Sequence, residues 1–246
     1  MKIYDVSLDI YSLWRKALTP LGLEAQKQTA FITKILKQNK CKMVIDLGGG
    51  IGVHAGALSN KGYSVTLLDS SSPALAYAKR NYPLLRTIQN SFESIDLSEN
   101  FDASLSMWTT FPYIINKNGR LTFFNWIKNH TNKVVILDQS NFYLYPNKFK
   151  QISYASDVLR KIKITREGTI DKNFLRKAFY HNEITDKKTG KKTILKDKEI
   201  LQFLPVASIK NYLGTKWKLW GLYGDYSFTK YDKKESPRLI TVFIRN

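Results

Sequence analysis

The stretch that decides the fold is Met43-Val-Ile-Asp46-Leu-Gly48-Gly-Gly50-Ile-Gly52-Val, followed by Asp69 at the end of the next apolar run. The pattern predicts a strand, a glycine turn, a helix and a second strand that ends in an acid. Glycines carry no Cβ, so a nucleotide-like ligand can lie directly on the turn. Asp69 follows Gly48 by 21 residues, where a carboxylate can accept both ribose hydroxyls. The stretch therefore predicts a site for an adenosine-containing cofactor.

Two cofactors are compatible with this turn. Residues 50–55, Gly-Ile-Gly-Val-His-Ala, match the relaxed dinucleotide fingerprint, so NAD is one possibility. The turn begins earlier, however, directly after Asp46, and an acid there would share a low-dielectric cleft with the charges of a pyrophosphate. The same acid suits a cofactor that carries an ammonium and a sulfonium and no phosphate. A third interpretation is a glycine-rich turn that serves only helix–sheet packing.

At this point the chain resembles the class I S-adenosylmethionine-dependent methyltransferases, whose first motif runs V-L-D-L-G-C-G-x-G. The corresponding residues are Val44-Ile-Asp46-Leu-Gly48-Gly49-Gly50-Ile-Gly52, with Gly49 in place of the usual Cys. The resemblance covers Glu24 to Leu137 well and the C-terminal part moderately. It implies S-adenosyl-L-methionine as cofactor and an α/β, Rossmann-like fold: a seven-stranded, mostly parallel sheet with an antiparallel C-terminal strand.

Further motifs of that family follow along the chain. Leu67-Leu-Asp69-Ser-Ser-Ser-Pro-Ala-Leu resembles V-D-x-S-P-x-x-L, and Asn90-Ser91-Phe92-Glu93 resembles G-D-F-E, whose acid contacts the adenine amino group. Ser91 stands in the place of that acid, which is a departure. Residues 101–113 resemble F-D-A-V-x-x-M-x-T-S-F-G-Y, a loop that borders the sulfonium and the acceptor in the family. The customary L-x-P-G-G is replaced by Asn129-His-Thr-Asn.

The C-terminal residues carry a more specific resemblance. Leu222-Tyr-Gly224-Asp-Tyr and Ser236-Pro-Arg238-Leu-Ile look like the L-Y-G-D-Y-D-G and S-P-R-L-I segments of bacterial small-molecule methyltransferases. This resemblance favours a small-molecule acceptor such as a sugar, an amine or a secondary metabolite, methylated on N or O.

The resemblance and the predicted strand ends together give a set of candidate site residues. For the cofactor these are Tyr11, Arg15, Asp46, Gly48, Gly50, Asp69, Ser70, Ser91, Phe92 and Trp108. Asp138, Asn141 and Tyr223 are candidate substrate contacts, because ligands of open α/β sheets bind at the carboxyl ends of the strands. His181 and Tyr113 are candidate catalytic groups on the acceptor side. No residue pattern predicts a metal site.

Beyond residue 146 the alternation of strands and helices is interrupted. Residues 161–166 alternate with period two, and residues 184–195 contain a Lys-Lys-Thr-Gly-Lys-Lys turn between apolar stretches, typical of a hairpin. We therefore expect residues 147–204 to form an inserted small antiparallel β lid over the acceptor. Residues 1–146 and 205–246 then make the Rossmann-like methyltransferase domain.

Composition narrows the functional classes without naming one. The 246 residues carry 39 Lys and Arg against 20 Asp and Glu, a net charge of +19, which suits nucleic acid, an anionic membrane surface or an acidic substrate. A single cysteine excludes a disulfide framework. No apolar run is long enough for a membrane span, and the polar N-terminus does not resemble a signal peptide, so a cytoplasmic location is expected.

Several functions stay open at this level. A small-molecule methyltransferase is favoured. An RNA methyltransferase is allowed by the charge but lacks a base-clamping motif at the fourth strand, so nucleic acid is a possible but not favoured partner. A non-catalytic cofactor-binding regulatory protein is a third possibility, and the tyrosine-rich segments would suit a homodimer.

Overall fold

The computed structural model describes residues 10, 11, 13, 14, 17 and 24–246. The chain divides into two compact units. The larger unit comprises residues 24–144 and 202–246, and the smaller comprises residues 145–201 together with the N-terminal segment.

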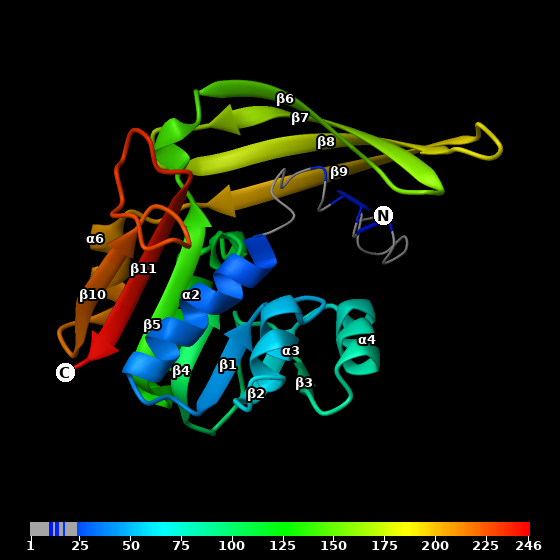
Figure 1. The fold of residues 1–246 in the computed structure, drawn as a ribbon. Helices are drawn as coiled ribbons and strands as arrows, with labels where there is room; N and C mark the ends of the chain where they lie inside the picture. The colour runs from blue at the N-terminus through cyan, green and yellow to red at the C-terminus, as the bar shows by residue number, and fades with distance from the viewer. Residues whose placement is uncertain (1–9, 12, 15–16, 18–23) are drawn as a thin grey trace. The chain divides into compact units, whose positions relative to one another are not determined.

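The larger unit is built on a seven-stranded sheet of order β10-β11-β5-β4-β1-β2-β3 (Figure 1). Strands β1 to β5 pair in parallel, whereas β11 runs antiparallel to both β5 and β10. This arrangement confirms the predicted fold class. The strands are β1 Met43–Leu47, β2 Ser64–Asp69, β3 Arg86–Gln89, β4 Phe101–Ser106, β5 Thr131–Ser140, β10 Trp217–Tyr223 and β11 Arg238–Arg245.

Helices cover both faces of this sheet, which is why its central strands are almost continuously apolar. Successive residues of β1 alternate between two cores: Val44 packs with one set of helices and Ile45 with the other. The first set is α2 Glu24–Gln38, α3 Val53–Ser59 and α4 Ser72–Asn81, and the second is α5 Lys117–His130 and α6 Val206–Leu213.

The chain leaves the larger unit after the short 3-10 helix η3, Phe142–Leu144, and returns to it at Gln202. The two junctions are held together. The Gln139 side chain donates to the Leu204 carbonyl (2.6 Å) and accepts from the Leu204 amide (3.2 Å). The rings of Phe142 and Phe203 stack with centroids 5.4 Å apart.

The smaller unit is a four-stranded antiparallel sheet of order β6-β7-β8-β9, as the sequence predicted for the inserted residues. One face is buried under an apolar cluster that includes Leu13, Ile162 and Ile164. The Trp14 indole donates to the Asn182 side chain on the same face (3.1 Å). The strands are β6 Lys148–Ser156, β7 Arg160–Ile170, β8 Leu175–Asp186 and β9 Lys192–Gln202. Within the described residues, no helix has the length and apolarity that crossing a membrane requires.

Candidate functional site

The candidate site lies at the carboxyl edge of the parallel strands in the larger unit. Asp46 lies in the last residues of β1, and the glycine turn follows that strand. Asp69 ends β2, Ser91 and Phe92 follow β3, and Trp108 follows β4. Because these strands are parallel neighbours, their ends meet at one edge, where open α/β sheets bind ligands.

The glycine turn depends on backbone conformations that other residues adopt at a cost. Gly48 and Gly50 have positive φ angles of 73° and 58°. A Cβ on Gly48 would lie 2.2 Å from the Thr110 Cγ2 atom, and one on Gly49 would lie 2.4 Å from an Asp46 carboxylate oxygen. The turn is therefore packed against its neighbours. The Cys that the family motif has at position 49 would displace the acid here.

Asp69 is held in place by backbone donors of the same edge. One carboxylate oxygen accepts from the Gly50 amide and the other from the Ser71 amide, both at 2.8 Å. The side chain is half-buried, so each oxygen keeps lone pairs for a ligand. A carboxylate fixed in this way suits the two hydroxyls of a ribose.

Asp46 is completely buried, and neither carboxylate oxygen has a hydrogen-bond partner among the described residues. Burial raises the pKa of Asp46 to about 7, and the negative charge of Asp69 adds to the rise. The Ala55 amide lies near enough to oppose this rise without completing a hydrogen bond. Buried polar groups are normally paired, so two orphaned acidic oxygens indicate a missing donor. An ammonium group, such as that of S-adenosylmethionine, fits them.

The chain takes an unusual turn after β4. Trp108 and Thr109 have positive φ angles of 62° and 66°, a conformation that costs non-glycine residues free energy. Asp138, at the end of β5, offsets this cost: its carboxylate accepts from the Trp108 amide (2.8 Å) and its carbonyl from the Thr109 amide (3.0 Å). The turn is therefore held from the neighbouring strand.

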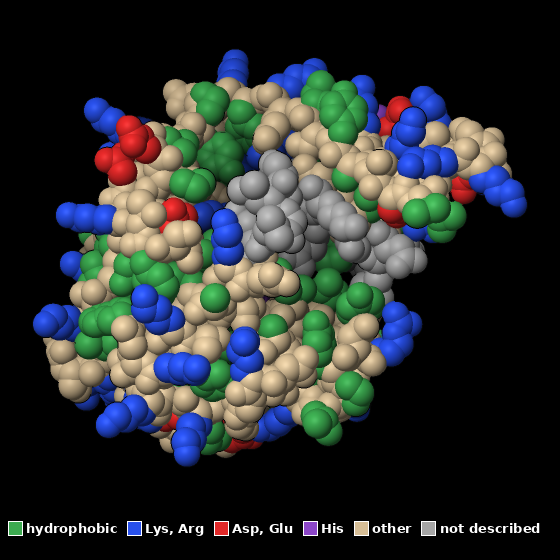
Figure 2. Space-filling model, in the orientation of Figure 1, with side chains coloured by type: hydrophobic (Ala, Val, Ile, Leu, Met, Phe, Trp, Pro, Cys, Tyr) green, Lys and Arg blue, Asp and Glu red, His purple; other side chains and the backbone are tan. Residues whose placement is uncertain are grey.

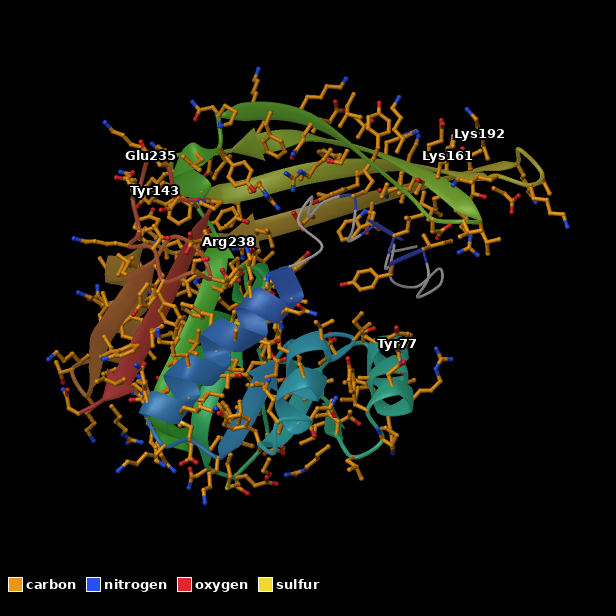
Figure 3. The ribbon with its side chains drawn as sticks, viewed as in Figure 1. Tyr77, Tyr143, Lys161, Lys192, Glu235 and Arg238 are labelled. Carbon is orange, nitrogen blue, oxygen red and sulfur yellow. The ribbon has the colours of Figure 1, made fainter. Side chains whose placement is uncertain are left out.

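The same carboxylate is occupied by further partners. Asp138 is completely buried and accepts from the Tyr226 hydroxyl (2.7 Å) and from two nitrogens of Arg238 (2.8 and 2.9 Å), which Figure 3 labels. The structure thus gives Asp138 an internal, positioning role. Direct contact with a substrate, which the sequence analysis predicted, would have to displace one of these donors.

Asn141 and Tyr223, the other predicted substrate contacts, are also engaged internally. The Asn141 amide donates to the carbonyls of Lys233 (3.0 Å) and Ser236 (2.8 Å) and so fixes the loop before β11. The Tyr223 ring meets the Phe31 ring edge-on, with centroids 5.4 Å apart. Their contact with an acceptor stays a prediction.

Gln28 is a site residue that the sequence analysis missed. It lies in α2, is 1% exposed, and its side-chain oxygen is shared by the Trp108 indole and the His54 ring. Its amide nitrogen has no partner within the described part of the chain. Helical spacing could not have found it, because a glutamine between apolar positions usually faces solvent.

The remaining predicted residues of this edge keep polar or aromatic surface available. Phe92 is half-buried, and its ring meets Phe123 edge-on at 5.7 Å. The Ser91 hydroxyl accepts from the Glu93 amide (3.2 Å). Ser70 is exposed beside Asp69, and Tyr113, in the 3-10 helix η2 (Phe111–Tyr113), is 44% exposed.

Two predicted residues, Tyr11 and His181, lie in the smaller unit. The Tyr11 ring stacks on Trp14 within the smaller unit, with centroids 6.0 Å apart. His181 lies on the exposed face of β8, opposite Thr165 of β7. Arg15 is outside the described residues. Where the structure describes the chain, no group of three His, Cys, Asp or Glu could hold a metal ion.

Comparisons with known proteins indicate a methyltransferase domain. Residues 44–134 match the model of the methyltransferase domain family. A glycine/sarcosine N-methyltransferase of Parasynechococcus marenigrum (strain WH8102) is 29% identical over 143 residues, which span 54% of this chain and only 50% of that enzyme.

Solved structures show the same fold over nearly the whole chain. An S-adenosylmethionine-dependent methyltransferase from Clostridium acetobutylicum ATCC 824 has a TM-score of 0.79 and 16% identity, and the match covers 100% of both chains. CalS10, an amino pentose methyltransferase from Micromonospora echinaspora involved in calicheamicin biosynthesis, was solved with S-adenosylmethionine bound. It has a TM-score of 0.76 and 13% identity, with 100% of this chain and 98% of that chain covered.

The sheet order and the glycine turn with its two acids define the class I methyltransferase architecture. Residues 44–134 match a methyltransferase domain, and this match together with the fold supports a class I S-adenosylmethionine-dependent methyltransferase.

Proposed function

We propose that this protein transfers a methyl group from S-adenosyl-L-methionine to a nitrogen atom of a small-molecule acceptor, such as an amino sugar or another amine. The observation that carries the proposal is the pair of acids at the carboxyl edge. Asp69 is fixed by two backbone donors and Asp46 is buried with two unpartnered oxygens. One acid suits a ribose diol, and the other suits an ammonium.

The residues of the edge bind and orient rather than react. Asp69 would accept the ribose hydroxyls, Asp46 would face the methionine ammonium, and Gly48 and Gly50 would allow the close approach. Phe92 would lie against the adenine. When bound, the cofactor supplies a methyl carbon on positively charged sulfur, and the acceptor lone pair forms a bond to this carbon as the carbon–sulfur bond breaks. Holding the two groups in line is the main contribution of the protein.

A nitrogen acceptor is favoured over an oxygen acceptor because the side chains of His54 and Asp138, at the carboxyl edge of the sheet, are already hydrogen-bonded within the protein. A hydroxyl must lose its proton to a base as it attacks, whereas a neutral amine attacks directly and loses its proton to water afterwards. The His54 ring is engaged by Gln28, and Asp138 is paired with Arg238, so both groups are already occupied. The matched relatives named for amine or amino-sugar methylation are in line with this choice. Oxygen methylation is the alternative.

Titration calorimetry with S-adenosylhomocysteine, with NAD as a parallel ligand, tests the cofactor. We expect binding of the first and none of the second. Asp69→Ala should weaken binding about 100-fold, since two hydrogen bonds to a charged group are lost at about 1.5 kcal/mol each. Glu235→Ala, an exposed acid of the same unit, is the matched control and should bind like the wild type. Binding of NAD alone would overturn the proposal.

The acceptor is tested by turnover. An amino hexose and the same hexose with a hydroxyl in place of the amine are offered with S-adenosylmethionine, and S-adenosylhomocysteine release is measured. Turnover of the amine alone is expected. Turnover of the hydroxyl compound alone would refute the choice of nitrogen and leave the cofactor assignment intact. His181→Ala and Tyr113→Phe, measured for KM of the acceptor, test the two predicted acceptor-side groups.

A further inference from the structure

One end of the four-stranded sheet combines two turns. The β6–β7 turn and the β8–β9 turn adjoin, because the Lys187 amide donates to the Leu159 carbonyl (2.8 Å) and Arg160 pairs with Asp186 across the β7–β8 ladder. We call residues 157–161 and 186–192 together the basic tip. Figure 1 shows the two hairpins ending on the same side of the sheet, and Figure 3 labels Lys161 and Lys192 at that end.

The basic tip exposes two aliphatic side chains at a tight turn. Val158 is 89% exposed and Leu159 is 61% exposed. Turn positions usually carry glycine, proline or short polar residues, so a Val-Leu pair there is unusual. The turn is nevertheless well formed: the Asp157 carboxylate accepts from the amides of Leu159 (2.8 Å) and Arg160 (2.7 Å). The backbone therefore holds the two apolar side chains at the surface.

Positive charge surrounds this apolar pair. The basic tip holds six basic residues and two acids, and both acids are used within their turns. Asp157 is bound as described above, and the Asp186 carboxylate accepts from the amides of Lys188 (2.9 Å) and Thr189 (2.7 Å). Figure 2 shows Lys and Arg gathered with apolar atoms at this end of the sheet. The basic residues are Arg160, Lys161, Lys187, Lys188, Lys191 and Lys192, the last of which also reaches Glu183 at 3.2 Å.

We propose that the basic tip docks this protein on an anionic lipid bilayer. Val158 and Leu159 would enter the boundary between headgroups and acyl chains, and the surrounding lysines and arginine would lie against the anionic headgroups. Charge alone would equally suit a nucleic acid. Sequence-independent sites for single strands, however, stack bases on aromatic rings, and the basic tip contains none. Exposed aliphatic side chains gain nothing from a phosphodiester backbone but gain from the acyl boundary.

Vesicle flotation tests the proposal with vesicles of 70% phosphatidylcholine and 30% phosphatidylglycerol, against pure phosphatidylcholine, in 0.1 M salt. The wild type should float with the first and not with the second. Lys188→Gln with Lys191→Gln should lower the partition coefficient about 25-fold, roughly fivefold for each lysine. Val158→Ser with Leu159→Ser should lower it at least about tenfold. Leu84→Ser, which changes a 95% exposed leucine of the larger unit, is the matched control and should float like the wild type.

A second measurement reports insertion directly. When bound to vesicles with brominated acyl chains, the Leu159→Trp variant should lose more tryptophan fluorescence than the wild type. The Leu84→Trp variant should lose no more than the wild type. The proposal is wrong if the variant with Val158→Ser and Leu159→Ser floats like the wild type. It is also wrong if the Leu159→Trp variant floats but the fluorescence of its added tryptophan is not quenched, because the basic tip then does not insert. It is equally wrong if the wild type stays unbound but binds a single-stranded oligonucleotide through Lys188 and Lys191.

Discussion

Asp46 should release a proton when the proposed cofactor binds. The carboxyl group is completely buried, burial raises its pKa to about 7, and Asp69 contributes to the rise. An ammonium placed beside its two unpartnered oxygens favours the ionised form, so the pKa of Asp46 falls on binding. Affinity should therefore increase as the pH rises toward and through 7.

The size of the effect follows from this pKa. In the free protein, the ionised fraction of Asp46 rises from about one tenth at pH 6 to about three quarters at pH 7.5 if its pKa is about 7. If the bound carboxyl is fully ionised at both pH values, the Kd of S-adenosylhomocysteine falls about eightfold across that interval. At pH 6 the release is about 0.9 protons for each molecule bound.

Titration calorimetry at pH 6 in buffers of different ionisation enthalpy measures the released protons from the slope of the apparent enthalpy. Asp46→Asn should abolish that slope and flatten the dependence of Kd on pH. The variant also tests stability. A raised pKa means that ionisation is disfavoured in the folded protein, so the free energy of unfolding falls as the pH rises from about 4 to about 7. Asn removes this loss, worth at most about 4 kcal/mol at pH 8.

One outcome refutes the reasoning without questioning the cofactor. If the wild type binds S-adenosylhomocysteine with the same Kd at pH 6 and pH 7.5 and releases no protons, while Asp69→Ala still weakens binding about 100-fold, Asp46 does not face the ammonium. Its orphaned oxygens would then need another donor.

Three further perturbations follow from the packing of the larger unit. Gly48→Ala should lower the free energy of unfolding in urea by about 2–4 kcal/mol, from its positive φ and its overlap with Thr110, and Thr110→Ser in the same chain should restore part of it. Asp138→Ala should lower the free energy of unfolding by about 3–5 kcal/mol, because it removes the buried carboxylate that pairs with Arg238. Adding Arg238→Met should recover part of that loss, and fully additive effects of the two substitutions would contradict the pairing. Burial raises the pKa of the Cys41 thiol to about 12. Iodoacetamide at pH 8 should therefore label the native protein far more slowly than the urea-unfolded protein. Equal labelling rates would show that the thiol is accessible in the native protein.

The fold class and the strand–turn–helix–strand unit with its acid could be predicted because their signals are local. The glycine turn and Asp69 lie within one βαβ unit, and the apolar runs show which strands are covered on both faces. The inserted sheet was predictable for the same reason, since alternation with period two and a Lys-Gly turn are short-range patterns.

The direction of individual polar side chains could not be predicted, because it depends on partners far along the chain. Asp138 and Asn141 do lie at the carboxyl end of β5, but Arg238, one hundred residues later, takes up the Asp138 carboxylate. The alternating pattern of β8 shows that the strand has a buried face and an exposed face, but not which residues belong to which. The packing of Leu13 and its neighbours on one face shows that His181 lies on the exposed face.

The closed junction of the larger unit has an evolutionary consequence. Because Gln139 binds Leu204 and Phe142 stacks on Phe203, the ends of the inserted sheet are fixed before its first strand begins. Lengthening a segment between fixed ends costs little conformational entropy. Selection can therefore exchange or remodel the inserted sheet while the carboxyl edge keeps its residues, so the proposed membrane docking can change without altering the residues proposed to bind the methyl donor.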